Sequence, residues 1–323
     1  MMALALAALL GTAFGFVASR GGFCLNSGLR TLLSGKTDKT RILLLAIAIQ
    51  AVTVPLMAAS GLTLRLPGFY PVGAIVGGLL FGASMHWASG CAAGVLYKAG
   101  EGSARAMVAA PAMALGAASL ELGPLSGLRE AVQSIGSSAS SWNFVESAGL
   151  DPLWVLPIGG VVGGVLLLRT ADAKVGAWSW RATGALVGLL GTVAWPLSAL
   201  AGRGFGLAVI PGAVGVVGAG AGWHDAVSWW DVVLVVGLVL GGFLATRRST
   251  HTRTRPTPAA MWRAAAGGLG LGVGGSLAAG CTVGHGLTGL PLLSTGSLVA
   301  MIAIVGGVAL TRRTSTAHTM VTS

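Results

Sequence analysis

Residues 89–94 read SGCAAG, and residues 279–284 read AGCTVG. Each stretch is a short glycine-rich break in an apolar part of the chain, and each carries one cysteine, Cys91 or Cys281. The two breaks fall in opposite halves of the 323 residues. Interruptions at corresponding positions of two halves are typical of helices that stop and restart at membrane depth around a binding site. We therefore interpret the two breaks as parts of one such site.

The composition around the breaks predicts an all-α polytopic membrane protein. Hydrophobic residues make up 54% of the chain and charged residues 9%, and the mean hydropathy is +0.82. Small residues four apart, such as Gly268 and Gly272, favour close helix packing in a bilayer. Apolar segments long enough to cross a hydrocarbon core of roughly 30 Å indicate about nine transmembrane helices, near residues 2–19, 42–60, 71–90, 106–123, 152–168, 182–200, 231–246, 264–281 and 292–310.

The distribution of charge predicts the topology. Loops rich in Lys and Arg face the cytoplasm, and counting crossings from an external N-terminus places every basic loop inside: residues 20–41, 98–105, 169–181, 247–263 and the tail at 312–313. The acidic segments 121–151 and 222–231 then face outward. We expect a multi-pass protein of the bacterial inner membrane with a cytoplasmic C-terminus. The first segment lacks a basic region before it, which indicates a retained span rather than a cleaved signal peptide.

A second pair of breaks predicts an internal repeat. Residues 21–24 read GGFC, residues 203–206 read RGFG, and each is followed later by one of the Gly-Cys breaks. We expect a single membrane domain over 1–323, with repeat one at about 1–123, an external linker and connecting span at about 124–170, and repeat two at about 178–312. Because the predicted topology gives equivalent breaks opposite orientations, the repeat is an inverted pseudo-two-fold one with short broken or re-entrant helices, pinched toward the membrane midplane.

All three cysteines of the chain lie in these breaks, so Cys24, Cys91 and Cys281 form the candidate substrate pathway. The residue equivalent to Cys24 in the second half is Gly206. A thiol is a weak donor and a soft partner, suited to a sulfur-bearing ligand. Helices that restart after a break aim free backbone N–H groups at the path, which favours an anion.

Polar residues beside the breaks are candidate supporting residues. The two histidines are suited to gating or proton relay, the residues after Cys24 and Cys91 to anion contact or the cytoplasmic exit, and the two arginines to attracting an anion. The competing explanation is that these side chains only hydrogen-bond to helix ends or, for the charged ones, only determine the membrane topology. The set is Arg20, Asn26, His86, Lys98, Glu101, Arg203 and His285.

Other functions receive less support from the sequence. Cys281 and His285 stand four residues apart, but none of the nine acidic residues falls inside a confident span, so we expect no metal site. The net charge of +11 is dispersed among short loops, which argues against nucleic acid. No phosphate-binding loop, dinucleotide fingerprint or Ser/His/Asp arrangement is present, so we expect a transporter, not an enzyme, and no cofactor. A membrane sulfur-transfer or thiol-redox enzyme and a metal-ion channel stay open as alternatives.

The motifs GGFC at 21–24, SGCAAG at 89–94 and AGCTVGHG at 279–286 resemble those of the YeeE/YedE family of bacterial membrane proteins, which take up sulfur compounds. The resemblance implies an hourglass-shaped inner-membrane importer of thiosulfate, with cysteines at positions like Cys24, Cys91 and Cys281 passing the ion through weak S–H contacts and no covalent intermediate. It also implies a small cytoplasmic sulfur-carrier partner of the TusA type. Related members are associated with selenium or persulfide movement. With the predicted topology, the ion enters near Cys281, passes Cys91 and leaves near Cys24.

Overall fold

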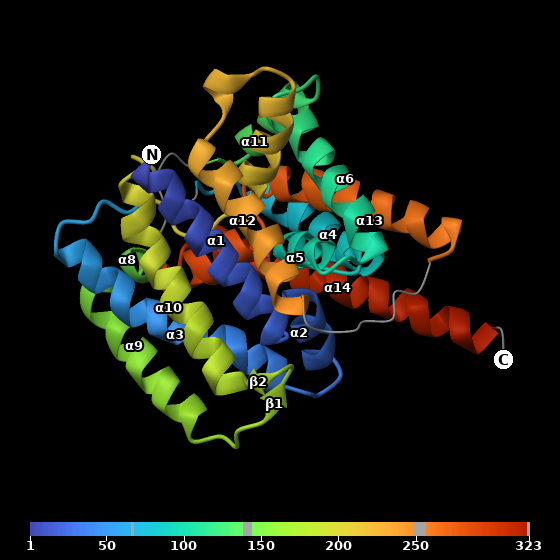
Figure 1. Cartoon of the computed structure of the whole chain (residues 1–323). Coiled ribbons are helices and arrows are strands. Elements are labelled where there is room, and N and C mark those ends of the chain that lie inside the picture. Colours follow the sequence, from blue (N-terminus) through green and yellow to red (C-terminus); the bar gives the residue numbers. More distant parts are fainter. Residues whose placement is uncertain (66–67, 138–143, 248–255, 322–323) are drawn as a thin grey trace.

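The fold is a single bundle of helices (Figure 1). This computed structural model describes residues 1–65, 68–137, 144–247 and 256–321. The helices of the first half are α1 (Met2–Arg20), α2 (Leu25–Leu32), α3 (Asp38–Ala59), α4 (Pro71–Ala88), α5 (Ala92–Gly100), α6 (Ala104–Glu121), α7 (Ser126–Ser134) and α8 (Phe144–Ser147). Those of the second half are α9 (Pro152–Leu168), α10 (Trp180–Ala199), α11 (Ile210–Gly220), α12 (Trp229–Thr246), α13 (Pro258–Leu277) and α14 (Thr295–Val321).

Shorter elements complete the described chain. A two-residue hairpin pairs β1 (Lys174–Val175) with β2 (Trp178–Ser179) in antiparallel register. The turns η1 (His224–Ala226) and η3 (Leu290–Leu292) are 3-10 helical, and η2 (Gly284–Gly289) is a π-helical turn directly after the second Gly-Cys break. The sequence analysis did not predict the hairpin or the π-helical turn.

The protein is an all-α membrane protein with six helical segments long and apolar enough to cross a bilayer. A seventh is added if α6 and α7, which meet at a bend of 70°, form one span. Every one of the nine predicted segments contains a helix, but nine full crossings are not reached by length and composition in the described chain. The exceptions are α6, which counts only together with α7, α9, which has 17 residues, and α13. The sequence analysis also missed α11, which has 11 residues. The six segments are Met2–Leu32, Asp38–Ala59, Pro71–Gly100, Trp180–Ala199, Trp229–Thr246 and Thr295–Arg312.

Helices from the two halves interlock through glycines. A side-chain carbon at Gly15 would collide with the Leu238 carbonyl, so α1 lies directly against the backbone of α12. On α13, Gly268 and Gly272 contact the carbonyls of Ala109 and Met113 on α6 in the same manner, which confirms the close packing predicted at that pair. α13 also packs on α4, and α4 on α14. Such close approach is what small residues allow between helices in lipid.

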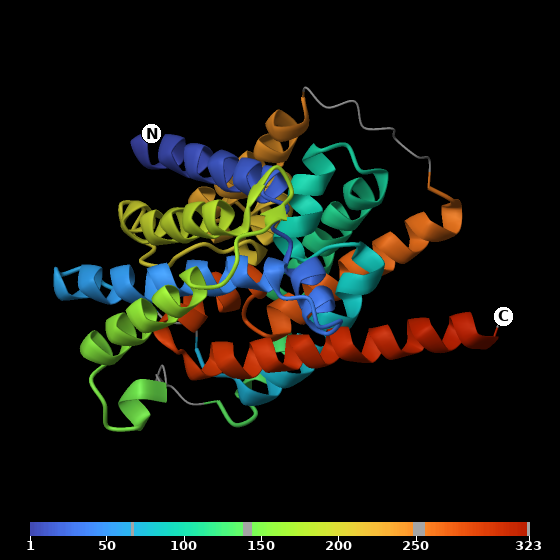
Figure 2. The ribbon, with the colours of Figure 1, turned by 90° about the horizontal axis from the view of Figure 1, so that it is seen from below.

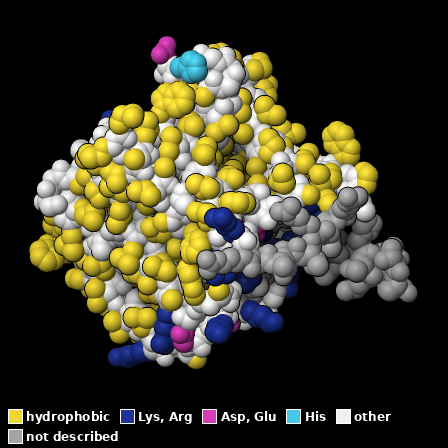
Figure 3. Space-filling view, viewed as in Figure 1, with side chains coloured by type: hydrophobic (Ala, Val, Ile, Leu, Met, Phe, Trp, Pro, Cys, Tyr) yellow, Lys and Arg dark blue, Asp and Glu magenta, His cyan; other side chains and the backbone are white. Residues whose placement is uncertain are grey.

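The surface of the bundle separates apolar and basic regions. Figure 3 shows hydrophobic side chains over most of the visible face and most of the visible Lys and Arg side chains toward one end, whereas a histidine and an acidic side chain mark the opposite end. Seen from below, α1, α10 and α3 run side by side (Figure 2), in agreement with their packing. An apolar belt with basic groups at one end is the arrangement expected of a membrane-embedded protein.

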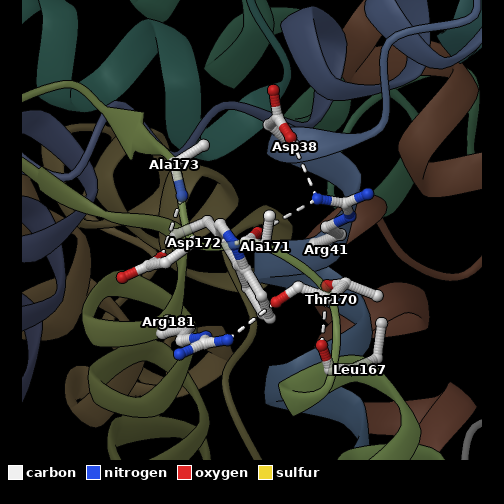
Figure 4. Close-up of polar contacts among 9 residues, drawn as sticks. Asp38, Arg41, Leu167, Thr170, Ala171, Asp172, Ala173 and Arg181 are labelled. Atoms are coloured by element: carbon white, nitrogen blue, oxygen red, sulfur yellow. Dashed lines mark hydrogen bonds and ion pairs between the residues drawn. The ribbon is translucent and has the colours of Figure 1, made fainter.

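A polar cluster fixes the link between α9 and α10. Arg181 donates to the Thr170 carbonyl and Arg41 to the Ala171 carbonyl (Figure 4). Arg181 also donates to the Leu168 carbonyl. The Trp180 ring is fully buried, with the two guanidinium groups over it at 5.6 and 6.0 Å. Cations at the last carbonyls of a helix stabilise its C-terminal end. The cluster thereby anchors the β1–β2 hairpin, whose turn donates from Ala177 N–H to the Arg20 carbonyl.

Candidate functional site

The four breaks share one backbone feature. The residue two positions before each Cys, or before Gly206, adopts a left-handed conformation, with φ of 64° at Gly22, 60° at Ser89, 58° at Gly204 and 58° at Ala279. Ser89 and Ala279 are two of the three described non-glycine residues with positive φ. A non-glycine residue pays roughly 1–3 kcal/mol for this conformation, and such strain persists where the surrounding structure requires it. The left-handed conformation of Ser89 and Ala279 therefore indicates that the surrounding structure holds both Gly-Cys breaks in place.

Each of the three breaks that carry a cysteine is followed by a new helical turn that starts at the thiol. Cys24 is the N-cap of α2 and Cys91 the N-cap of α5, both in extended conformation. Cys281 precedes the helical pair Thr282–Val283 and then η2. The first N–H groups of a helix have no partner within it, and the helix dipole makes that end electropositive. The three thiols thus lie where the chain is best able to receive an anion.

The Cys24 and Cys91 thiols lie together in the interior. Their residues are 7% and 2% exposed, and a side-chain carbon on Gly94 would lie 3.3 Å from each sulfur. The sulfurs are therefore separated by no more than twice that distance, the two thiols interact, and Gly94 lies beside both. The Lys98 ammonium lies 3.9 Å from the Cys24 sulfur and donates to the Ser89 carbonyl at 2.8 Å. Helix α5 brings these groups together, because it begins directly after Cys91 and its last turn carries Lys98 to the Cys24 thiol.

The Cys281 thiol is surrounded by backbone donors. It is 1% exposed, and the backbone N–H groups of Val209, Val283 and Gly284 face its sulfur. Val209 is the N-cap of α11, so two helix starts meet at this thiol. The neighbouring Thr282 side chain lies toward Cys91, which connects the break of the second half with that of the first.

A cavity of about 250 Å³ lies beside Cys281. Arg129 of α7 and Arg203 contribute cationic groups to its wall, and the breaks contribute Phe205, Gly280 and Cys281. The Arg203 guanidinium stacks over the Phe205 ring at 5.3 Å and donates from Nη1 to the Gly206 carbonyl at 3.4 Å. Two guanidinium groups around one small cavity are suited to an anion.

Asp231 corrects one expectation from the sequence. No acidic residue was expected inside a confident span, but Asp231 is fully buried in the first turn of α12. Its Oδ2 lies 2.8 Å from Arg203 Nε. The break carries Arg203 into the protein, and a buried guanidinium requires a nearby counter-charge. Glu121, the last residue of α6, likewise contacts another helix, since it accepts a hydrogen bond from the Ser276 hydroxyl at 2.9 Å.

The structure explains why no thiol occupies the place of Gly206. A side-chain carbon there would lie 2.8 Å from Thr288 Oγ1 and 3.0 Å from Trp195 Nε1. Thr288 donates to the Leu207 carbonyl at 2.8 Å, so it is held in position. Trp195 is 1% exposed. The second half therefore fills with side chains the space that the Cys24 thiol occupies in the first half.

Two predicted supporting residues are occupied with other contacts. Asn26 Nδ2 donates to the Met85 carbonyl at 3.0 Å, which ties α2 to α4 and leaves its Oδ1 without a partner in the described chain. His86 Nδ1 lies 2.6 Å from Arg30 Nη1. Because an arginine side chain can only donate, His86 Nδ1 accepts, and this ring is neutral in the contact.

His285 supports the break rather than a metal ion. Its Nε2 donates to the Ala278 carbonyl at 3.0 Å, and its Nδ1 accepts from the Ser297 hydroxyl at 3.1 Å. A side-chain carbon on Gly280 would collide with the ring. Within the described ranges, no group of three or more His, Cys, Asp or Glu side chains could hold a metal ion. Both ring nitrogens of His285 are thus engaged with the protein.

Arg20 and Glu101 lie at the edge of the site. The Arg20 side chain is exposed, and its carbonyl accepts from the hairpin turn. Glu101 accepts a hydrogen bond from Ser19 at 2.5 Å, which joins the ends of α1 and α5. Both contacts hold the mouth of the first break together. The structure therefore groups Lys98 with Cys24 and Arg203 with Cys281, but it does not bring Arg20 or His86 to a thiol.

Four residues of the site escaped the sequence analysis. Thr282 lies against Cys91, the Tyr97 phenol lies against Cys24, Arg129 lines the cavity, and Asp231 pairs with Arg203. Thr282 and Tyr97 lie in or next to the quoted motifs, so the motif positions were the available signal. Arg129 and Asp231 come from segments interpreted as external loops, and nothing in those segments indicated that they turn inward.

Comparison with known proteins identifies relatives over nearly the whole chain. The sulphur transport family matches residues 20–310. The thiosulfate transporter TsuA of Escherichia coli (strain K12) is 29% identical over 326 residues, which cover 92% of this chain and 90% of that protein. The thiosulfate transporter TsuA of Spirochaeta thermophila is 30% identical over 318 residues, covering 93% and 95%.

A further relative matches a smaller part. The probable transporter YedE of Escherichia coli (strain K12) is 32% identical over 100 residues, which cover 31% of this chain and 25% of that protein. The full-length similarity is thus to the two thiosulfate transporters.

Proposed function

This chain belongs to the sulphur transport family, and from that premise we propose that it imports thiosulfate across the bacterial cytoplasmic membrane. The ion enters the cavity beside Cys281, passes Cys91 and leaves beside Cys24. The observation that carries the proposal is the placement of every thiol of the chain, buried and free, at the start of a new helical turn. The full-length similarity to two thiosulfate transporters supports thiosulfate as the substrate.

The entrance attracts an anion without trapping it. Arg129 and Arg203 both line the cavity, but Asp231 compensates the charge of Arg203. The Glu121 carboxyl in turn lies near Arg129, so both guanidinium groups act on a dianion mainly through their remaining N–H donors. Such a site raises the local concentration of the ion and still permits its release.

Passage relies on weak contacts. Thiosulfate carries a soft terminal sulfur, which suits the polarizable S–H groups of Cys281, Cys91 and Cys24. Backbone N–H groups at Cys281 provide the remaining stabilisation for the charge. Because S–H donors are weak, no single thiol holds the ion for long, and the ion moves between neighbouring thiols with no bond made to sulfur.

The exit lies at the basic end. Lys98 stands beside Cys24 and the Ser89 carbonyl, and Arg105 donates to the Ser89 hydroxyl. Basic groups near the ends of spans face the cytoplasm, so this end is inside, the N-terminus is outside, the C-terminus is cytoplasmic and the chain crosses about nine times. A small cytoplasmic carrier of the TusA type receives the sulfur there.

The shared left-handed residues support an inverted repeat. Gly22 and Ser89 precede the breaks of a repeat at about 1–123, and Gly204 and Ala279 precede those of a repeat at about 178–312, with φ values within a few degrees of one another. The segment at about 124–170 links them. Breaks that enter from opposite faces give an hourglass shape in which the thiols lie near the midplane.

One contact favours a second candidate function. The Lys98 ammonium beside Cys24 is the kind of neighbour that stabilises a thiolate, which suits a membrane enzyme that transfers sulfur through a persulfide. A related sulfur or selenium species is a further alternative substrate. Mass spectrometry of protein trapped during turnover distinguishes the enzyme: a persulfide on any of the three cysteines would favour it, and unmodified thiols favour transport.

Radiolabelled thiosulfate uptake into proteoliposomes tests the proposal. We expect uptake above that of empty liposomes, inhibited by excess thiosulfate and little affected by the same concentration of sulfate. Competition by selenium-containing analogues measures the selectivity, and an imposed proton gradient measures the coupling. Equal uptake by protein-containing and empty liposomes would contradict the proposed function.

A further inference from the structure

Thr282 is a buried donor without a strong partner. The residue is fully buried, and its Oγ1 makes no hydrogen bond of good geometry to any described residue; its interaction is with the weakly bonding Cys91 thiol. A hydroxyl left unpaired in the interior is destabilising, and such groups are rare in native proteins. Thr282 directly follows Cys281, and its side chain lies toward the Cys91 thiol. The unpaired hydroxyl is therefore placed between two of the three thiols.

The break itself removes the usual partner of this hydroxyl. A threonine within a helix commonly donates to the carbonyl four residues earlier, which here is Ala278. Ala278 is the C-cap of α13, before the break, and its carbonyl accepts from His285 Nε2. The left-handed Ala279 then turns the chain away from the helix axis. The same residues that form the break leave the Thr282 hydroxyl without a carbonyl partner and directed toward the Cys91 thiol.

We propose that the Thr282 hydroxyl donates a hydrogen bond to the thiosulfate anion as the anion moves between Cys281 and Cys91. This inference rests on the proposed transport function and adds a substrate-binding residue to it. A hydroxyl is a stronger donor than a thiol and suits an anionic oxygen, whereas the thiols suit the terminal sulfur. The second half lacks a thiol at Gly206, where Thr288 and Trp195 fill the space. Thr282 provides a donor for this half of the pathway.

Replacement of Thr282 by valine and by serine tests the inference in proteoliposomes. Thr282→Val keeps the shape and removes the donor, and Thr282→Ser keeps the donor. We expect initial thiosulfate uptake to fall at least about tenfold in Thr282→Val, the loss typical of one hydrogen bond to a charged group, and Thr282→Ser, which keeps the donor, to retain clearly more uptake than Thr282→Val.

Thermal unfolding separates this role from a structural one. Because the Thr282 hydroxyl has no oxygen or nitrogen partner in the described part of the chain, and a thiol is a weak partner, Thr282→Val should unfold at the same temperature as wild type or a higher one. Thr288→Val is the matched control from the following turn, since its hydroxyl donates to the Leu207 carbonyl, and its unfolding temperature should fall.

The outcomes are distinguishable. If the wild-type protein takes up thiosulfate and Thr282→Val takes it up at the same rate, the inference is overturned and the proposed function stands. Loss of uptake together with a lowered unfolding temperature in Thr282→Val would assign the residue a structural role and also overturn it. Absence of uptake by the wild-type protein would contradict the proposed function itself.

Discussion

Replacing Gly94 with alanine is expected to slow thiosulfate uptake without removing a thiol or unfolding the protein. The added methyl carbon would lie 3.3 Å from both the Cys24 and the Cys91 sulfur. Ordinary contacts of such a carbon begin near 3.4 Å, so each sulfur must move by a few tenths of an ångström. More importantly, the methyl group occupies the space between the two thiols through which the proposed pathway runs.

The size of the effect follows from packing. Forcing an extra methyl group into a filled interior costs about 1–3 kcal/mol, and if that cost applies to the ion as it passes, uptake falls by roughly 5- to 150-fold. In the resting protein the replacement of glycine by alanine within helix α5 stabilises by roughly 0.5–1 kcal/mol, which offsets the cost of the small displacement of the two sulfurs. The expected combination is therefore slower uptake at nearly unchanged stability.

Initial uptake rates in proteoliposomes and thermal unfolding in detergent measure the two effects. Gly28→Ala is the matched control, because it lies in the short helix α2 after the Cys24 break and its added carbon would have Lys39 atoms as nearest neighbours, at 3.8 Å. We expect Gly28→Ala to transport at the wild-type rate. A Gly94→Ala protein that transports as fast as Gly28→Ala would refute passage between Cys24 and Cys91.

Two further substitutions test the cavity and the missing thiol. Asp231→Asn leaves the Arg203 guanidinium buried without its counter-charge and should lower the free energy of unfolding by about 3–5 kcal/mol. An unchanged denaturation midpoint would show that the Arg203–Asp231 ion pair does not stabilise the fold. Gly206→Cys should lower the free energy of unfolding by about 1–3 kcal/mol, because the new side chain overlaps Thr288 and Trp195. An unchanged unfolding temperature would show that Thr288 and Trp195 can move aside at little cost.

The sequence predicted the helical segments and the breaks more fully than the packing around them. The apolar segments contain helices, the family expected from the cysteine motifs is confirmed, and short helices follow Cys24 and Cys91. These features are local, since they depend on hydrophobic length and on glycines within a few residues. Helix α11 was missed because residues 210–220 are too few and too glycine-rich for a full span.

Features that depend on contacts between distant segments were not predictable from the sequence. The sequence places Asp231 between a predicted loop and a predicted span, and it is buried only because α12 packs near the break at Arg203. Likewise, the proximity of Cys24 and Cys91 depends on how α5 folds back toward α2. Local composition carries no information about such pairs, because the distance between them is set by tertiary packing.

Uptake of radiolabelled thiosulfate by Cys91→Ala proteoliposomes tests the central claim most directly. Cys91 is the thiol between the other two, since it adjoins Cys24 across Gly94 and faces Thr282 next to Cys281. With wild-type protein as reference and thermal unfolding to verify the fold, uptake should fall to the level of empty liposomes. Uptake by folded Cys91→Ala at the wild-type rate would contradict a pathway through the three thiols.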